Sequence, residues 1–126
     1  MKRRRCVLLV NCFPDEREMY DDYLRYAGFD AVDVCEPSDA FETAVAMQPD
    51  VIVTDTALPH GLSGLDLIER LRRDPRTQHI KIIVVSGHAF TQHRRQAERA
   101  GCDLFLPKPC LPQTLVTAIN GELNAA

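Results

Sequence analysis

The segment Val51-Ile52-Val53-Thr54-Asp55 is an apolar run that ends in a carboxylate and is followed by the turn residues Leu58-Pro59-His60-Gly61. Short β-branched runs bounded by proline and glycine are typical of buried strands. We therefore expect Asp55 to stand at the carboxyl end of a strand. In open parallel sheets, that edge is where ligands and chemistry are placed.

Strand-like and helix-like segments alternate five times along the chain. Strands are expected at 7–10, 31–35, 51–54, 80–85 and 104–106, and helices at 14–27, 37–48, 63–73, 90–100 and 112–123. The connections are too long for hairpins and the strands are apolar on both faces, which predicts a parallel sheet between helices. At this size the commonest arrangement is the doubly wound, flavodoxin-like (βα)5 fold with strand order 2-1-3-4-5.

Length and composition are those of one globular domain, 1–126 with a core of about 5–123, and no output domain is visible. No apolar run is long enough to cross a bilayer. A net charge of -3, with no basic stripe beyond residues 2–5, disfavours nucleic acid as a partner. Five cysteines without a CxxC pair predict reduced thiols and a cytoplasmic location.

Two further strands end in polar residues that could join Asp55. The run 80–85 leads into Ser86, and the run 104–106 leads into Pro107-Lys108-Pro109. Because parallel strands bring their carboxyl ends to one edge, an acid, a hydroxyl and an amine are expected to share it. The two prolines form a stiff frame that fixes the amine of Lys108 in place.

Over nearly its whole length the chain resembles the receiver domain of two-component response regulators, which is CheY-like. The matching features are the strand ending in Asp55, the loop residues Leu58-Pro59 and Gly64, and three later motifs. These motifs are Val84-Val85-Ser86-Gly87, Ala100-Gly101-Cys102-Asp103 and Leu106-Pro107-Lys108-Pro109. Their order and spacing together are highly specific.

The resemblance implies a phosphorelay switch. Asp55 matches the aspartate that accepts a phosphoryl group from a sensor histidine kinase or a histidine phosphotransfer protein. Lys108 matches the lysine that pairs with the phosphoryl oxygens, and Ser86 the hydroxyl residue that hydrogen-bonds them. A carboxylate is a competent nucleophile in aspartyl-phosphate chemistry, and phosphoryl transfer depends mostly on positioning and electrostatics.

The chain departs from the family at the end of its first strand. The two adjacent acids that usually hold a divalent cation there match Asn11 and Cys12, so Asp55 is the one acid left of that cluster. The remaining positions of the family's cation site are Asp55 and the backbone of Ala57. Mg²⁺ prefers oxygen ligands and a thiol is a poor substitute, so we expect magnesium to bind weakly if at all.

Two further consequences follow from this departure. An isolated Asp55 favours a stable ion pair with Lys108, and phosphorylation is expected to be slow or absent. The alternative function is therefore a degenerate pseudo-receiver that binds a protein partner without phosphorylation. A hydrolase using Asp55 as nucleophile is disfavoured, because position 57 is alanine and no general base is evident.

Readout in the family runs through the hydroxyl residue and an aromatic on the last strand, here Ser86 and Phe105. His88 matches a position that modulates loss of the phosphoryl group. The resemblance also implies a cis peptide bond between Lys108 and Pro109. The expected contact surface for a downstream protein is formed by the fourth helix, the fifth strand and the fifth helix. We expect a monomer or a weak homodimer that is not attached to a membrane. No enzymatic activity is expected beyond autocatalytic phosphoryl acceptance.

Overall fold

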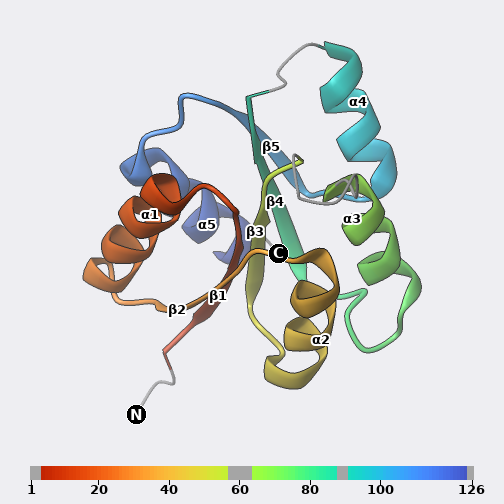
Figure 1. Cartoon of the computed structure of the whole chain (residues 1–126), viewed down its shortest axis with the longest axis horizontal. Coiled ribbons are helices and arrows are strands. Elements are labelled where there is room, and N and C mark those ends of the chain that lie inside the picture. The colour runs from red at the N-terminus through yellow and green to blue at the C-terminus, as the bar shows by residue number, and fades with distance from the viewer. Residues whose placement is uncertain (1–3, 57–63, 88–90, 125–126) are drawn as a thin grey trace.

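The computed structural model describes residues 4–56, 64–87 and 91–124. Within these residues, strands and helices alternate strictly (Figure 1). In chain order the elements are β1 (Cys6–Val10), α1 (Pro14–Tyr26), β2 (Asp30–Val34), α2 (Pro37–Met47), β3 (Val51–Thr54), α3 (Gly64–Arg73), β4 (Lys81–Ser86), α4 (Thr91–Ala100), β5 (Leu104–Pro107) and α5 (Pro112–Asn124).

The five strands form one parallel sheet in the order β2-β1-β3-β4-β5. This confirms the predicted fold. Successive side chains of a strand point to opposite faces, so each central strand feeds two cores. Leu8 and Ile52 pack toward α2, α3 and α4, whereas Leu9 and Val53 pack toward α1 and α5. Figure 1 shows the two helical layers on either side of the sheet.

Two helices begin with the residues that the sequence marks as helix starts. Proline stands in the first turn of both α1 and α2, where its missing N–H costs no hydrogen bond. Asp15 and Glu16 in α1 and Asp39 in α2 lie where the helix dipole favours negative charge.

Helix α4 is weakly anchored, as its thin apolar stripe predicts. Its buried residues are Ala97 and Ala100, the smallest apolar side chains with a Cβ. Phe90, expected on the same stripe, lies outside the described residues. Little apolar burial holds a helix loosely, so we expect α4 to be displaced at a low cost in free energy.

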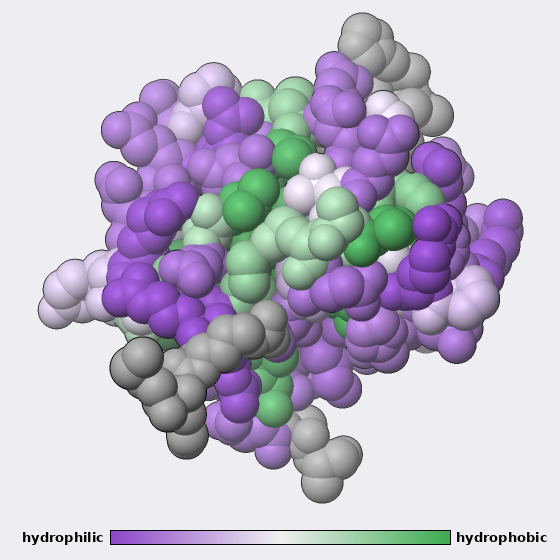
Figure 2. Space-filling model, turned by 90° about the horizontal axis from the view of Figure 1, so that it is seen from below, coloured by the Kyte–Doolittle hydropathy of each residue, from purple (hydrophilic) through white to green (hydrophobic). Residues whose placement is uncertain are grey.

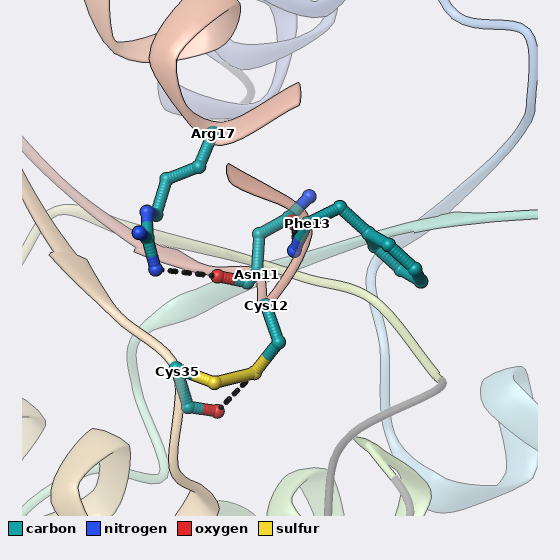
Figure 3. Close-up of a disulfide and its surroundings, with 5 residues drawn as sticks. All are labelled: Asn11, Cys12, Phe13, Arg17 and Cys35. Carbon is teal, nitrogen blue, oxygen red and sulfur yellow. Dashed lines mark hydrogen bonds between the residues drawn. A yellow bond between two sulfur atoms is a disulfide. The ribbon is translucent and has the colours of Figure 1, made fainter. Parts of the chain in front are cut away.

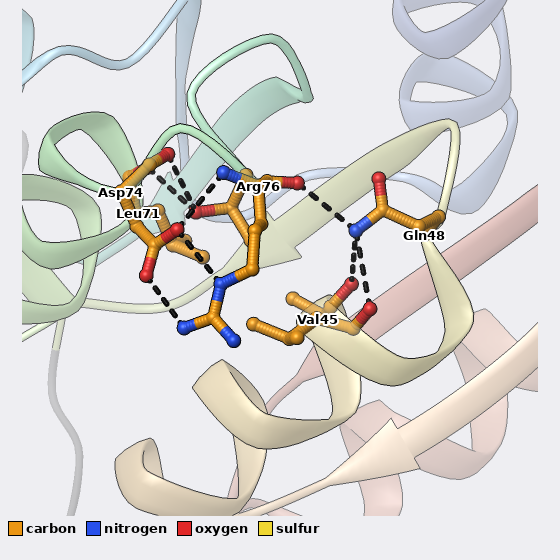
Figure 4. A network of polar contacts seen from close by, with 7 residues as sticks. Val45, Gln48, Leu71, Asp74 and Arg76 are labelled. Atoms are coloured by element: carbon orange, nitrogen blue, oxygen red, sulfur yellow. Dashed lines mark hydrogen bonds and ion pairs between the residues drawn. The ribbon is translucent and has the colours of Figure 1, made fainter.

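The edge of the sheet opposite Asp55 is closed by polar contacts between loops. Gln48, after α2, donates through Nε2 to the carbonyl oxygen of Arg76 at 2.9 Å and of Val45 at 3.1 Å. Asp74 accepts from the guanidinium of Arg76 at 2.8 and 3.0 Å. Figure 4 shows this network joining the end of α2 to the loop before β4.

Much of the surface is polar. Figure 2 shows a face of the molecule on which hydrophilic residues surround a central strip of hydrophobic ones. Among the described residues, no helix is both long and apolar enough to span a bilayer.

Candidate functional site

The hydrogen-bond ladder of the sheet continues past the strands and positions the site. The backbone N–H of Asp55 donates to the carbonyl of Val10 at 3.2 Å, and that of Lys108 donates to the carbonyl of Ser86 at 2.8 Å. Buried backbone groups need such partners, so the ladder fixes these residues in register. Asp55, Ser86 and Lys108 therefore lie at one edge of the sheet, as the sequence predicts.

Asp55 and Lys108 form an ion pair. The Asp55 side chain is 3% exposed and its Oδ2 accepts a hydrogen bond from Nζ of Lys108. The peptide bond between Lys108 and Pro109 is cis, which confirms that prediction. The pKa of Lys108 lies above its ordinary value: burial acts to lower it, but hydrogen bonds to Asp55 and Glu16 outweigh that effect. The ammonium therefore stays charged.

A second carboxylate shares the same ammonium. Nζ of Lys108 lies 2.7 Å from Oε1 of Glu16, in the first turn of α1. Asp55 is therefore not an isolated carboxylate at this edge, although it is still the one acid left of the family's cation-binding cluster. Glu16 also accepts from the side-chain amide of Asn11 at 3.3 Å. Sequence reasoning missed Glu16 because it sits on a helix, where only the rotation of α1 against the sheet decides which side chain faces the edge.

The hydroxyl of Ser86 is fully buried and has Thr56 as a neighbour. The two hydroxyl oxygens lie 2.7 Å apart, and either can donate. Thr56 directly follows Asp55, so its place beside the acid was available in the sequence although it was not singled out. Together these residues put two hydroxyls at the sheet edge that carries the acid and the amine.

Close packing of α3 against the acid requires glycine at position 64. A Cβ built on Gly64 would lie 2.1 Å from the carbonyl oxygen of Asp55, a distance that no side chain tolerates. The N–H of Gly64 donates to the carbonyl of Thr56 at 3.0 Å. Gly64 therefore lets the start of α3 pack directly against the backbone of Asp55 and Thr56.

Phe105 is buried at 5% exposure, with the guanidinium of Arg94 5.5 Å from its ring centroid. The ring is thus packed inside, between β5 and α4, where a change in its packing would reach α4. His88 and Ala57 lie outside the described residues, so the structure describes neither the modulating position nor the backbone ligand.

Cys12 and Cys35 form a disulfide, with their Cα atoms 4.7 Å apart (Figure 3). The prediction that all cysteines are reduced is therefore wrong for this pair, whereas Cys6, Cys102 and Cys110 are not in disulfides. The reason is topological. Cys12 and Cys35 are separated by 23 positions, but they follow β1 and β2, which are parallel neighbours whose ends meet. A search for local CxxC spacing cannot find such a pair.

The residues present do not fit a tightly held magnesium ion. Cys12 is committed to the disulfide, and Oδ1 of Asn11 accepts from the N–H of Phe13 at 2.7 Å. Asp55 and Glu16 already share the ammonium of Lys108. In the part of the chain that the structure describes, no three acidic, histidine or cysteine side chains gather in a way that could hold a metal ion.

The fold and this edge define a class: a doubly wound α/β domain with a buried aspartate, a lysine and hydroxyls at the carboxyl end of its sheet. Residues 7–120 match the family model of the response regulator receiver domain. The chain belongs to that family, and it is a receiver domain of two-component signalling.

Sequence relatives agree with this assignment. The chain is 31% identical over 118 residues to the phosphate regulon transcriptional regulatory protein PhoB of Pseudomonas aeruginosa, covering 94% of this chain and 51% of PhoB. It is 24% identical over 120 residues to the polar-differentiation response regulator DivK of Brucella anthropi, covering 95% of this chain and 97% of DivK. The chain thus spans about half the length of PhoB and nearly all of DivK.

Solved structures confirm the fold. The chemotaxis response regulator CheY4 of Vibrio cholerae superimposes with a TM-score of 0.87 at 21% identity, covering 94% of this chain and 98% of CheY4. The receiver domain of a sensor histidine kinase from Pseudomonas aeruginosa, solved with magnesium coordinated in its active-site cleft, gives a TM-score of 0.89 at 23% identity. That match covers 98% of this chain and all of the solved one.

Proposed function

We propose that this receiver accepts a phosphoryl group on Asp55, slowly and with little dependence on magnesium, and transmits its state through protein contacts. The observation that carries the proposal is the buried Asp55 carboxylate held by the ammonium of Lys108. A carboxylate is a competent nucleophile in aspartyl-phosphate chemistry, and an adjacent cation offsets the charge that develops on the incoming phosphoryl group.

Slow transfer follows from the electrostatics of the edge. Lys108 is shared between Asp55 and Glu16, so an incoming phosphoryl group must compete with a carboxylate for it. The Cys12–Cys35 disulfide also takes up the position that a metal-binding acid has in the family. The similar receiver domain of the histidine kinase was solved with magnesium in its active-site cleft. We propose that this chain binds magnesium only weakly.

The phosphoryl donor is proposed to be a histidine kinase or a histidine phosphotransfer protein. A hollow of about 500 Å³ lies beside Lys108 and is lined mainly by apolar residues of α1 and of the segment before α5, among them Met19, Tyr20 and Leu111. An exposed apolar surface next to a charged acceptor suits a protein that must present a phosphohistidine to Asp55.

The downstream partner is proposed to bind across α4, β5 and α5. A second hollow of about 380 Å³ lies on this face, lined by Arg94, Glu98, Asp103 and Phe105 among others. Because Phe105 borders the hollow and also packs behind the edge that carries Asp55, a change at the acceptor can alter this surface through one side chain.

A phosphorylation-independent binding module is the second candidate, favoured by the ion pair that already neutralises Asp55. The two functions are separated by incubating the protein with acetyl phosphate or a phosphohistidine donor, with and without magnesium, and measuring the intact mass. We expect the mass of one phosphoryl group to be gained slowly, and Asp55→Asn to gain none. If no donor modifies the wild-type protein, the constitutive module is correct.

A further inference from the structure

The disulfide lies at the mouth of the acceptor site and not in the core. Cys12 follows β1 and directly precedes Phe13, the N-cap of α1; Cys35 follows β2 and directly precedes Glu36, the N-cap of α2. Both cysteine residues are partly exposed. A partly exposed disulfide can be reduced by thiols in solution more readily than a buried one, because exchange requires attack on a sulfur atom.

Helix starts also favour the products of reduction. The first N–H groups of α1 and α2 have no side-chain cap, and a helix N-terminus stabilises negative charge such as that of a thiolate. Asp15, Glu16 and Asp39 in the first turns act in the opposite direction. The placement of both sulfurs before helix starts is nevertheless that of reactive rather than buried structural cysteines.

A chain of contacts leads from the disulfide to Asp55. Asn11 precedes Cys12, its Oδ1 accepts from the N–H of Phe13, and its amide donates to Glu16 at 3.3 Å. Glu16 holds Lys108, and Lys108 holds Asp55. Figure 3 shows Asn11 and Arg17 beside the disulfide, with the Arg17 guanidinium donating to the Asn11 carbonyl. The bond that ties Cys12 to β2 therefore also fixes the turn that positions Glu16.

We propose that Cys12–Cys35 is a redox-active site, reduced by a dithiol, whose state controls the Glu16–Lys108–Asp55 contacts. One thiolate of the reductant attacks a sulfur and the other sulfur leaves as a thiolate, which takes a proton. The second thiol of the reductant then resolves the mixed disulfide. Two electrons pass from the dithiol, which becomes a disulfide, to the pair, which becomes two thiols. The consequence for Asp55 rests on the proposed function; the redox chemistry does not.

The redox step is tested on the full chain in dithiothreitol buffers of stepped oxidation, with free thiols trapped by a maleimide and counted by intact mass. We expect two thiols to appear in one transition, mapped to Cys12 and Cys35. The matched control Cys102→Ser removes a partly buried free cysteine and should leave the transition unchanged, whereas Cys35→Ser should abolish it. The proposal would be overturned if the maleimide labelled both Cys12 and Cys35 in fully oxidising buffer. It would also be overturned if the disulfide were reduced only after the protein had unfolded.

The coupling is tested by amide NMR spectra of the oxidised and reduced protein. We expect the Glu16 and Lys108 amides to shift on reduction, in the wild type and in Cys102→Ser, while the Arg72 amide stays in place. Shifts confined to residues adjoining the two cysteines would refute the coupling.

Acetyl phosphate labelling adds a readout at Asp55. We expect the reduced protein to be labelled about threefold faster, because a loosened turn lets Glu16 release Lys108. Equal rates in the two states would contradict control of the acceptor. If Asp55 is labelled in neither state, the proposed phosphoryl function fails, while the thiol and NMR measurements still decide the redox proposal.

Discussion

Two ion pairs join distant parts of this chain at opposite ends of the sheet, and they are built in different ways. Arg72 pairs with Asp103 at 2.7 Å at the end of the sheet opposite the acceptor, and Lys108 pairs with Asp55 at the acceptor. The difference between them separates a fixed structural tie from a contact that can change partners.

Arg72 uses its whole guanidinium. Besides Asp103, its donors reach three backbone carbonyls at 2.7 to 2.8 Å, those of Gly101, Gln78 and Ile80. Gly101 has a φ of +120°, and a Cβ there would lie 2.7 Å from Cγ of Arg72, so glycine allows the close approach. Every nitrogen of this planar fork is engaged, so its geometry is fixed by several partners at once.

Lys108 is a point charge shared by two acids. Its ammonium meets Asp55 and Glu16 from different elements, and the ring of Phe13 lies 4.7 Å away. An ammonium on a flexible stem can turn from one acceptor to another with little loss of hydrogen-bond geometry. The same kind of charge pairing therefore stabilises one end of the sheet and leaves the other able to receive a new anion.

The largest expected effect on stability is that of Arg72→Met. The change removes a donor from three carbonyls and leaves Asp103 with the N–H of Ile82 at 2.8 Å, and we expect the free energy of unfolding in urea to fall by about 2–4 kcal/mol. The matched control is Arg73→Met on the same helix, whose exposed pair with Glu69 should matter by less than about 0.5 kcal/mol. Equal losses in the two variants would contradict a special role for Arg72.

Lys108→Met is expected to slow phosphoryl transfer to Asp55. Loss of the cation that pairs with Asp55 should slow acetyl phosphate labelling about 100-fold, because the ammonium of Lys108 would no longer offset the charge on the incoming phosphoryl group. Lys81→Met, at the start of β4 and far from the acid, serves as control and should be labelled at the wild-type rate. A labelled Lys108→Met protein with unchanged kinetics would show that the amine is not used.

Glu16→Gln tests whether the second carboxylate competes for Lys108. Removing its charge frees the ammonium and reduces repulsion of an anionic donor, so labelling should be about fivefold faster, a change of ~1 kcal/mol in the barrier. Asp15→Asn, its exposed neighbour in the same helical turn, should have no such effect. Slower labelling of Glu16→Gln in the presence of magnesium would instead identify Glu16 as a metal ligand.

The smallest expected effect is a difference in alkaline stability. The pKa of Lys108 in the folded protein lies above the 10.5 of a free lysine, so the ion pair contributes fully below pH 10.5 and is lost as the pH rises through the folded value. Urea unfolding of the wild type should thus converge with that of Lys108→Met at high pH. Burial raises the pKa of Tyr20 to about 12, so high pH also destabilises the fold through this residue, and it does so equally in both proteins.

Much of the fold could be predicted because periodicity reports burial. The five apolar runs became the five strands, with the second shifted by one residue to Asp30–Val34 and the fourth by one residue to Lys81–Ser86, and Pro112 did begin the last helix. The place of Asp55 and Lys108 followed as well, since both end strands of one parallel sheet. What each side chain contacts could not be predicted in the same way, as Ser86 shows by pairing with Thr56.

By itself the sequence determined the order of elements, the sheet edge that carries the acid and the amine, and the cis bond before Pro109, the last through family resemblance. Only the tertiary structure decided that Glu16 reaches Lys108 and that Cys12 is bonded to Cys35. The physical reason is that local patterns record which residues leave water, whereas contacts between elements depend on how helices are rotated and strands are ordered in space.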